Sequence, residues 1–203
     1  MKNRKMFRTS DMDMRVAQSD GKKVIEGYFI VFNSRTELWN GYFEEIRKES
    51  LEGQLDKDIR ALFDHDSSKV LARAKNGTLK MEVDDIGLYG VIEINENDSE
   101  ALNLYERVKR GDIDQCSFGF FIEDSEIQNL ENGQVLEIIT RMNLVEISVV
   151  TFPAYEATSV KARKKDFEEE QRQKEIEEQK QRQQEVNDFK YKLQTKLKEA
   201  LDK

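Results

Sequence analysis

The chain has 203 residues, of which 37% are hydrophobic and 36% are charged, and its formal net charge is −8. This length suits one ordinary domain with an appendage. The acidic balance argues against a general nucleic-acid binder, which usually carries a basic face. No apolar run approaches a membrane span, and the N-terminus lacks a secretory h-region, so we expect neither nucleic acid nor membrane as a partner.

Two residue types are scarce enough to restrict the chemistry. Cys116 is the single cysteine, which excludes an internal disulfide and suggests a reducing compartment. His65 is the single histidine, which excludes a Cys/His zinc site of the usual kind and any mechanism with two histidines. The sequence therefore predicts no metal and no cofactor.

The first half of the chain reads as closely spaced strands. Residues 1–11 are polar and basic and are expected to form a flexible arm. Asp-Gly at 20–21 and Asn-Gly at 76–77 are typical of hairpin turns, residues 33–42 are expected to be a loop, and Lys48–Leu55 a short helix. The expected strands comprise Met14 and Val16, then Val24–Phe32, Tyr42–Ile46, Ile59–Phe63, Val70–Ala74, Leu79–Val83 and Leu88–Ile94.

One helix interrupts the strands. Leu102, Tyr105 and Val108 recur at helical spacing, after a cluster of N-cap residues and before Gly111, a natural stop. This pattern predicts a helix over Ser99–Arg110.

Three more strands are expected at residues 115–122, 135–142 and 144–151. Short strands at regular spacing predict a mainly β domain with helices (α+β), a sandwich or antiparallel barrel with the helix inserted. We assign this domain to residues 12–160.

The composition changes after Val160. Lys, Arg, Glu and Gln dominate residues 161–185, and an apolar stripe then recurs at helical spacing through Val186, Phe189, Leu193, Leu197 and Leu201. A solvated helical tail over 161–203 and a short coiled coil that binds a partner or forms a homo-oligomer both fit this pattern.

The strand Gln115–Ile122 carries one hydroxyl in an apolar run. Alternate side chains share a face, so Ser117 and Gly119 lie on one face and Phe118 and Phe120 on the other, toward a core. Taken alone, such a serine is most often buried and bonded to a carbonyl. A serine becomes a nucleophile only when a base removes its proton.

His65 is the sole histidine that could act as this base, because imidazole titrates near neutral pH. Glu146 interrupts the apolar strand at 144–151, and burying a carboxylate is costly unless it is paired. A carboxylate can orient an imidazole and stabilise the imidazolium. A structural histidine flanked by solvated Asp64 and Asp66, and a solvent-facing glutamate, stay open, because chain spacing cannot show that the three residues converge.

Three other residues are candidates for the site. Cys116 raises the alternative of a cysteine nucleophile, but neighbouring strand residues face opposite sides, so only one of Cys116 and Ser117 can meet His65. Gly119 is interpreted as room for substrate backbone beside the nucleophile. Arg141 could orient a water or an oxyanion-donor loop, with a surface arginine as the alternative.

Several segments, in this order, resemble the prohead maturation proteases of tailed bacteriophages: Glu26–Tyr28, Asn33-Ser34, Phe63–Asp66, Asp85–Leu88, Ser117–Phe120 and Leu144–Tyr155. The resemblance implies a serine endopeptidase with a fold similar to herpesvirus assemblin, an antiparallel β-barrel ringed by helices. It also implies Ser117 as nucleophile, His65 as general base and Glu146 as the third member, where assemblin has a second histidine.

The resemblance further implies a role in capsid maturation and virion assembly. The partners would be the major capsid protein and its scaffold, cut inside the assembling procapsid in the host cytoplasm, with self-cleavage. One rival is a catalytically inactive scaffolding or structural protein of the procapsid. Another is an esterase or lipase, which would prefer a Gly-x-Ser-x-Gly elbow, whereas Gln115 stands two residues before Ser117.

Overall fold

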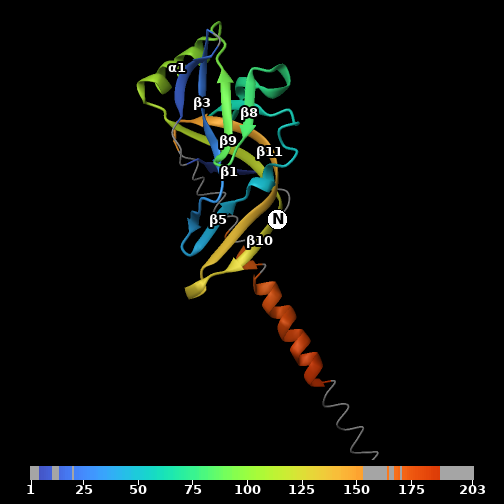
Figure 1. Ribbon diagram of the computed structural model, residues 1–203. Helices are drawn as coiled ribbons and strands as arrows, with labels where there is room; N and C mark the ends of the chain where they lie inside the picture. The colour runs from blue at the N-terminus through green and yellow to red at the C-terminus, as the bar shows by residue number, and fades with distance from the viewer. Residues whose placement is uncertain are drawn as a thin grey trace, which may run out of the picture. The chain divides into compact units, whose positions relative to one another are not determined.

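The computed structural model describes residues 5–10, 14–19, 21–152, 164, 167–169 and 171–187. The chain divides into two compact units, Met1–Val160 and Lys161–Lys203. The described residues of the first unit form two β-sheets and one α-helix (Figure 1). The mainly β class with helices is therefore confirmed.

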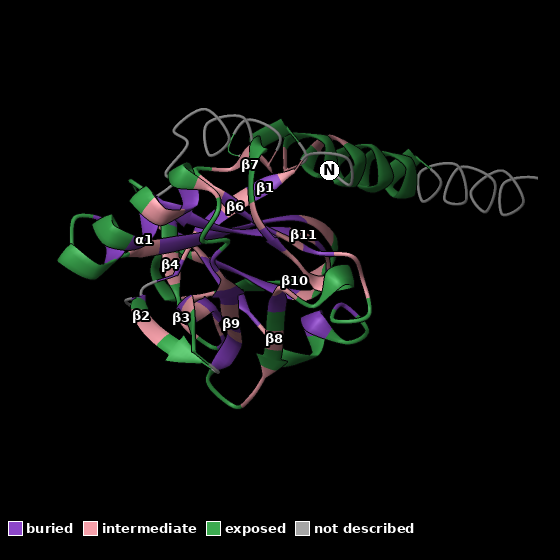
Figure 2. Cartoon of the chain, turned by 90° about the horizontal axis from the view of Figure 1, so that it is seen from above, coloured by how far each residue is buried: buried purple, intermediate pink, exposed green. Residues whose placement is uncertain are grey.

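The larger sheet is built on one long strand, β11 (Val135–Val150). Antiparallel β10 (Gln115–Asn129) pairs along its length, and β1 (Met6–Thr9) covers the outer edge of β10 as the last strand on that side. The two strands predicted at 135–142 and 144–151 are thus one continuous element. Buried residues run along the parts of β10 and β11 that face the second sheet (Figure 2).

The other edge of β11 is shared by two shorter strands. β5 (Tyr42–Ile46) runs parallel to its first half and β6 (Arg60–Phe63) parallel to its second half. β4 (Thr36–Trp39) pairs with β5, and β7 (Asp66–Arg73) pairs with β6. The segment 33–42, predicted to be a loop, therefore contains a strand. The strand was not predicted because most residues of this segment are polar.

The smaller sheet is antiparallel, in the order β2 (Arg15–Ser19), β3 (Lys22–Val31), β9 (Gly87–Glu93) and β8 (Leu79–Val83). The predicted β2–β3 hairpin is confirmed. The Asn76-Gly77 turn is not a hairpin, because it joins β7 of the larger sheet to β8 of the smaller one.

One α-helix, α1 (Ser99–Arg110), follows β9 as predicted. The side chain of Asp98 caps it by accepting hydrogen bonds from the amides of Glu100 and Ala101, and Gly111 ends it with a φ of 82°. Short 3₁₀ turns lie at Lys48–Leu51, Ala74–Asn76 and Glu131–Gly133, the first of them within the expected helix at 48–55.

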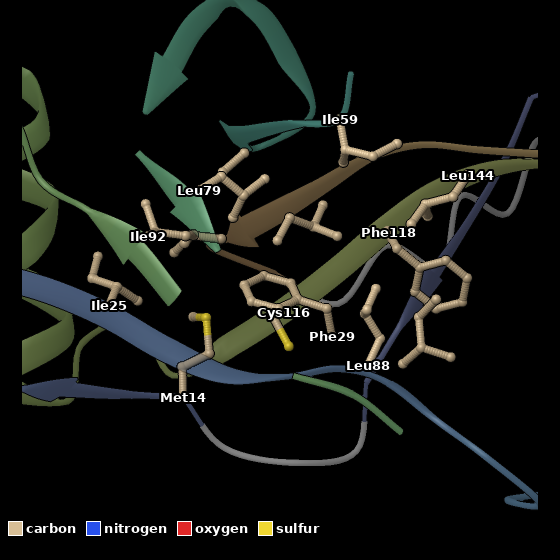
Figure 3. Packing of buried hydrophobic residues seen from close by; sticks show 14 of the residues in the cluster. Met14, Ile25, Phe29, Ile59, Leu79, Leu88, Ile92, Cys116, Phe118 and Leu144 are labelled. Atoms are coloured by element: carbon tan, nitrogen blue, oxygen red, sulfur yellow. The ribbon is translucent and has the colours of Figure 1, made fainter. Parts of the chain in front are cut away.

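A single hydrophobic core joins residues from both sheets, including Phe29 of β3, Cys116 and Phe118 of β10, and Leu88 of β9 (Figure 3). The predicted inward orientation of Phe118 and Phe120 is confirmed, since both rings are buried and stacked.

The pairings among the described residues form two separate sheets rather than one closed ring of strands. The barrel that the resemblance implies therefore stays a prediction.

The predicted flexible arm at residues 1–11 is wrong for Met6–Thr9, which form β1. The strand is held because Met6 packs into the core and the Arg8 guanidinium makes a buried two-bond ion pair with Glu44, at 2.6 and 2.9 Å. The sequence pattern does not predict this strand, because one of its inward-facing residues is an arginine rather than an apolar residue.

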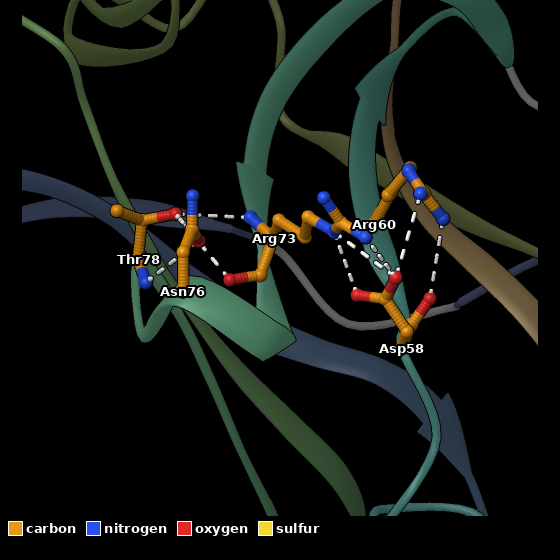
Figure 4. A network of polar contacts seen from close by, with 5 residues as sticks. All are labelled: Asp58, Arg60, Arg73, Asn76 and Thr78. Atoms are coloured by element: carbon orange, nitrogen blue, oxygen red, sulfur yellow. Dashed lines mark hydrogen bonds and ion pairs between the residues drawn. The ribbon is translucent and has the colours of Figure 1, made fainter.

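A polar network ties the start of β6 to the end of β7 (Figure 4). Asp58 accepts hydrogen bonds from Arg73 and, at 3.4 Å, from Arg60, and the bonds from Arg73 lower the pKa of Asp58 to about 2. The hydroxyl of Thr78 accepts a hydrogen bond from the backbone amide of Arg73 and donates one to the side-chain oxygen of Asn76. The network fixes the two strands whose connection carries His65.

In the second unit the described residues are helical and mostly exposed. Ion pairs four residues apart, Lys164 with Glu168 and Glu178 with Arg182, line this helix. Of the predicted apolar stripe only Val186 lies within the described residues, so the coiled coil stays a prediction. Within the part of the chain that the structure describes, no helix is both long and apolar enough to cross a bilayer.

Candidate active site

His65 lies in a two-residue turn between β6 and β7. Phe63 pairs with Asp66, so Asp64 and His65 alone make the turn, with φ values of 49° and 58°. Positive φ at both central residues is typical of a tight hairpin turn but costs free energy in residues other than glycine. The turn projects the imidazole from the end of the sheet.

Asp64 ties this turn to the end of β11. Its carboxylate accepts hydrogen bonds from the amide of Thr151 at 2.7 Å and from the Thr151 hydroxyl at 2.9 Å. Its own amide donates to the carbonyl of Val149 at 2.9 Å. The side chain that precedes the histidine thus holds the turn against the strand that carries Glu146, and Asp66 instead accepts bonds from Ser68.

The imidazole of His65 lies between the serine and the glutamate. Its Nδ1 is 2.7 Å from Oε1 of Glu146, and its Nε2 is 2.8 Å from Oγ of Ser117. An ionised carboxylate only accepts hydrogen bonds, so Nδ1 carries a hydrogen and Nε2 faces the hydroxyl. Ser117 is fully buried, and the side chain of Glu146 is 2% exposed.

Strand register brings the serine and the glutamate together. Ser117 is opposite Ser148, and Gly119 is opposite Glu146, on the paired strands β10 and β11. The next pair, Phe120 with Leu144, shows a bulge that leaves one extra residue on β11 beside the glutamate. Three segments far apart in the chain therefore meet at one point.

The carboxylate of Glu146 is buried and well supplied with partners. Its Oε2 accepts the Ser148 hydroxyl at 2.6 Å, and Lys5 Nζ lies 3.2 Å from Oε1. Burial favours the neutral acid, but the hydrogen bond and charge of His65, with Ser148 and Lys5, outweigh it and hold the pKa of Glu146 below its ordinary value. The alternative of a solvent-facing glutamate is therefore wrong.

We predicted that Gly119 leaves room for substrate backbone, but the structure shows no such space. A Cβ added there would lie 2.3 Å from Oε1 of Glu146 and 2.5 Å from the Lys5 side chain. The space over this glycine is taken by the carboxylate itself, so a bare residue is required for the glutamate to reach His65.

Arg141 is not brought to the site. It pairs with Asp124, five residues along β11 from Glu146, which corresponds to roughly 16 Å of strand. Its side chain is exposed and lies 3.5 Å from Glu123. The structure makes it a surface arginine, and the predicted role in orienting a water is not supported.

Cys116 faces away from the histidine. It is fully buried in the core, and its thiol donates to the carbonyl of Tyr28 at 3.2 Å. Ser117 also lies inside a strand rather than at a strand–helix turn, so the elbow of an esterase is not formed. Neither the cysteine nucleophile nor the esterase reading is supported.

Sequence reasoning missed three contacts of this site. Ser148 could have been found, because it shares a strand face with Glu146 two residues away. The bond from Asp64 to Thr151 and the approach of Lys5 depend on tertiary structure and leave no local signal. Among the described residues no group of three or more His, Cys, Asp or Glu could hold a metal ion.

A serine, an imidazole and a buried carboxylate in this order are the arrangement of a serine hydrolase. The family model described as Caudovirus prohead serine protease matches residues 10–173. The chain belongs to this family, and the resemblance inferred from the sequence motifs is confirmed.

Two known proteins are similar to this chain. The prohead protease of Enterobacteria phage HK97 is 27% identical over 146 residues, which cover 71% of this chain and 62% of that protein. The match thus spans less than two thirds of that relative. The capsid assembly protease of bacteriophage T4 has a TM-score of 0.47 and 13% identity, with 72% of this chain and 96% of the T4 chain covered.

Proposed function

We propose that this protein is a serine endopeptidase that removes the scaffolding portion of capsid subunits, and cuts itself, during procapsid maturation. The observation that carries the proposal is the imidazole of His65, hydrogen-bonded on one side to Ser117 at 2.8 Å and on the other to Glu146 at 2.7 Å. Membership of the prohead serine protease family supports the same activity.

In the proposed reaction Oγ of Ser117 attacks the carbonyl carbon of the scissile peptide while Nε2 of His65 takes the hydroxyl proton. Glu146 holds the Nδ1 hydrogen and stabilises the imidazolium. The imidazolium then gives its proton to the leaving amine, and an acyl-serine ester remains. Water, deprotonated by the same histidine, hydrolyses that ester and restores the serine. We assign stabilisation of the oxyanion to backbone N–H groups.

The partners we propose are the major capsid protein and its scaffold, inside the assembling procapsid in the host cytoplasm. We also propose an assemblin-like barrel for residues 12–160, and that the charged tail at 161–203 retains the enzyme in the shell. Support comes from the family match and from the change of composition after Val160.

Co-expression with the cognate capsid protein tests the activity. Ser117→Ala should abolish processing of the capsid protein and self-cleavage, and it should remove labelling by a fluorophosphonate. Ser67→Ala makes the same chemical change at an exposed serine two residues after His65 and should leave all three unchanged. Processing that continues in Ser117→Ala would refute the nucleophile assignment.

A catalytically inactive procapsid protein is the second candidate. The observation in its favour is the complete burial of Ser117, whose hydroxyl also donates to the carbonyl of Arg8 at 2.8 Å. This alternative predicts that a fluorophosphonate never labels the wild-type protein and that capsid subunits stay uncut in its presence.

A further inference from the structure

Two buried side-chain oxygen atoms in the described part of the chain have no hydrogen-bond partner, and both belong to neighbours of Ser117. One is Oγ1 of Thr9, the register partner of Ser117 on β1, and the other is Oε1 of Gln115, two residues before Ser117 on β10. Buried polar atoms without a partner are rare, because leaving one unpaired costs free energy. The chain therefore keeps hydrogen-bonding groups beside the nucleophile that its own fold does not use.

Gln115 shares the strand face of the nucleophile. Alternate residues of a strand point the same way, so Gln115, Ser117 and Gly119 lie on one face of β10. Gly119 is the register partner of Glu146, so Ser117 lies between the amide and the level of the acid. At about 3.3 Å of rise per residue, the Cα atoms of Gln115 and Ser117 lie roughly 7 Å apart, which leaves space for one oxygen atom between their side chains.

Other side-chain donors around the site already have partners. The guanidinium of Arg8 makes a buried ion pair with a glutamate of β5, at 2.6 and 2.9 Å. The ammonium group of Lys5 and the hydroxyl of Ser148 both contact the carboxylate of Glu146, at 3.2 and 2.6 Å. The side chain of Gln115, by contrast, makes no hydrogen bond to another described residue. Its amide is therefore free to bind a group of the substrate.

The amide of Gln115 can present either an acceptor or a donor at the buried position. Its oxygen and nitrogen exchange places when the group makes a half-turn about its last bond, with almost no change in shape. With Oε1 inside, the buried atom finds no donor. With Nε2 inside, the amide offers a hydrogen to any acceptor that arrives beside Ser117. A negatively charged oxygen atom is the strongest acceptor that the proposed reaction produces there.

We propose that the side-chain amide of Gln115 donates a hydrogen bond to the oxyanion that forms when Ser117 attacks the scissile carbonyl. The inference deepens the proposed function, on which it rests, by adding a catalytic side chain to the backbone N–H groups. Side-chain amides can act as oxyanion donors in acyl transfer. Gln115 suits this role better than Thr9, because β10 carries both the amide and the nucleophile and so fixes their spacing.

Gln115→Met in the full-length chain removes the donor and keeps the length of the side chain. A fluorophosphonate reports on the donor, because its phosphoryl oxygen takes the place of the oxyanion when it reacts with Ser117. The rate of labelling should fall about 100-fold, and kcat for cleavage of the cognate capsid protein should fall by a similar factor at unchanged KM. Gln128→Met makes the same change at an exposed position of β10 and should alter neither rate by more than about twofold.

The stability of the variants distinguishes a catalytic role from a structural one. Because Gln115→Met removes a buried oxygen that has no partner, the midpoint of urea unfolding should stay the same or rise. A glutamine that merely supported the strand would lose stability and rate together. Gln115→Glu is the second variant, since a carboxylate has the same shape but no hydrogen to donate. It should slow labelling at least as much, because its charge repels the oxyanion.

The results separate this inference from the proposed function. Labelling of Gln115→Met at the rate of a reactive wild type overturns the role of the amide and leaves the serine protease intact. A slower rate in Gln115→Met that accompanies a lowered urea midpoint also overturns it, because the glutamine is then structural. A wild type that is neither labelled nor able to cut capsid protein refutes the proposed function and, with it, the role of Gln115.

Discussion

At the scale of single residues, the site depends on a carboxylate that stays ionised although it is buried. Glu146 achieves this with hydrogen bonds from His65 and Ser148 and with the nearby charge of Lys5. The proposed mechanism requires one histidine, and the sequence contains one. In the proposed mechanism the imidazole is the base and the glutamate orients it.

The lowered pKa of Glu146 makes the folded protein sensitive to acid. Because this pKa is lower folded than unfolded, the carboxylate stabilises the fold above its unfolded pKa, and that contribution disappears as the pH falls through the folded pKa. In urea titrations between pH 7 and pH 3, wild type should lose stability below about pH 4.5. Glu146→Gln should show a shallower loss over that range, and an identical slope in both proteins would contradict the assignment.

Asp64 is expected to act as a positioning residue for the histidine. Asp64→Ala removes two hydrogen bonds to Thr151 and leaves alanine at a positive φ, which should cost roughly 1–3 kcal/mol of stability. It should also lower kcat for peptide cleavage about tenfold or more with little change in KM, because the imidazole loses its orientation.

Asp64→Asn is the rescue variant, since asparagine tolerates a positive φ and keeps an acceptor for the Thr151 amide. Asp66→Ala, at the other neighbour of His65, is the matched control and should affect kcat far less. A kcat unchanged in Asp64→Ala would show that the turn holds the histidine without this tie.

At the scale of elements, the β10–β11 pair sets the distance between nucleophile and acid. Gly119→Ala would place a methyl group 2.3 Å from Oε1 of Glu146. The carboxylate must then move away from His65, so we expect cleavage to fall at least about 100-fold at unchanged KM. If Gly119 instead made room for substrate, the variant would raise KM, and kinetics on a peptide substrate distinguish the two results.

The elements also show where sequence patterns suffice. The helix α1 could be predicted to the residue because its cap, its apolar face and its terminal glycine are all local. The Asn76-Gly77 turn and both flanking strands could be predicted, but the pairing of those strands with each other was wrong, since a turn signal does not say which sheet each flanking strand joins. β1 was missed because Arg8, which points inward, reads as a surface residue until Glu44 is brought to it by the fold.

At the scale of the whole molecule, the sequence indicated which three residues could form the triad. It did not show that they lie close together in space. Local propensity placed Ser117 and Glu146 on strands, and the family resemblance supplied the expectation that they meet. The distances depend on register between strands that are far apart in the chain. Nothing in the spacing of His65, Ser117 and Glu146 contains that information.

The second unit should matter for location more than for chemistry. Deleting residues 161–203 should lower incorporation of the enzyme into procapsids, because its exposed helix is available to bind scaffold or capsid protein. Cleavage of a soluble peptide should change less than about twofold, as expected for surface residues away from the site. Quantitative immunoblots of purified procapsids provide the first readout, and equal loss of both would contradict the role of the tail.

The position of β11 between β10, β5 and β6 has a consequence for biosynthesis. In the parallel pairing of β6 with β11, Arg60 is the register partner of Glu146. The long chain segment between these two residues must be closed into a loop before His65 can contact the carboxylate of Glu146. Such non-local pairings form slowly and only after the distant strand exists. A ribosome-bound chain that ends before residue 146 therefore carries the serine and the histidine but no acid. Under the proposed function, proteolytic competence therefore arises only with β11, the last strand among the described residues.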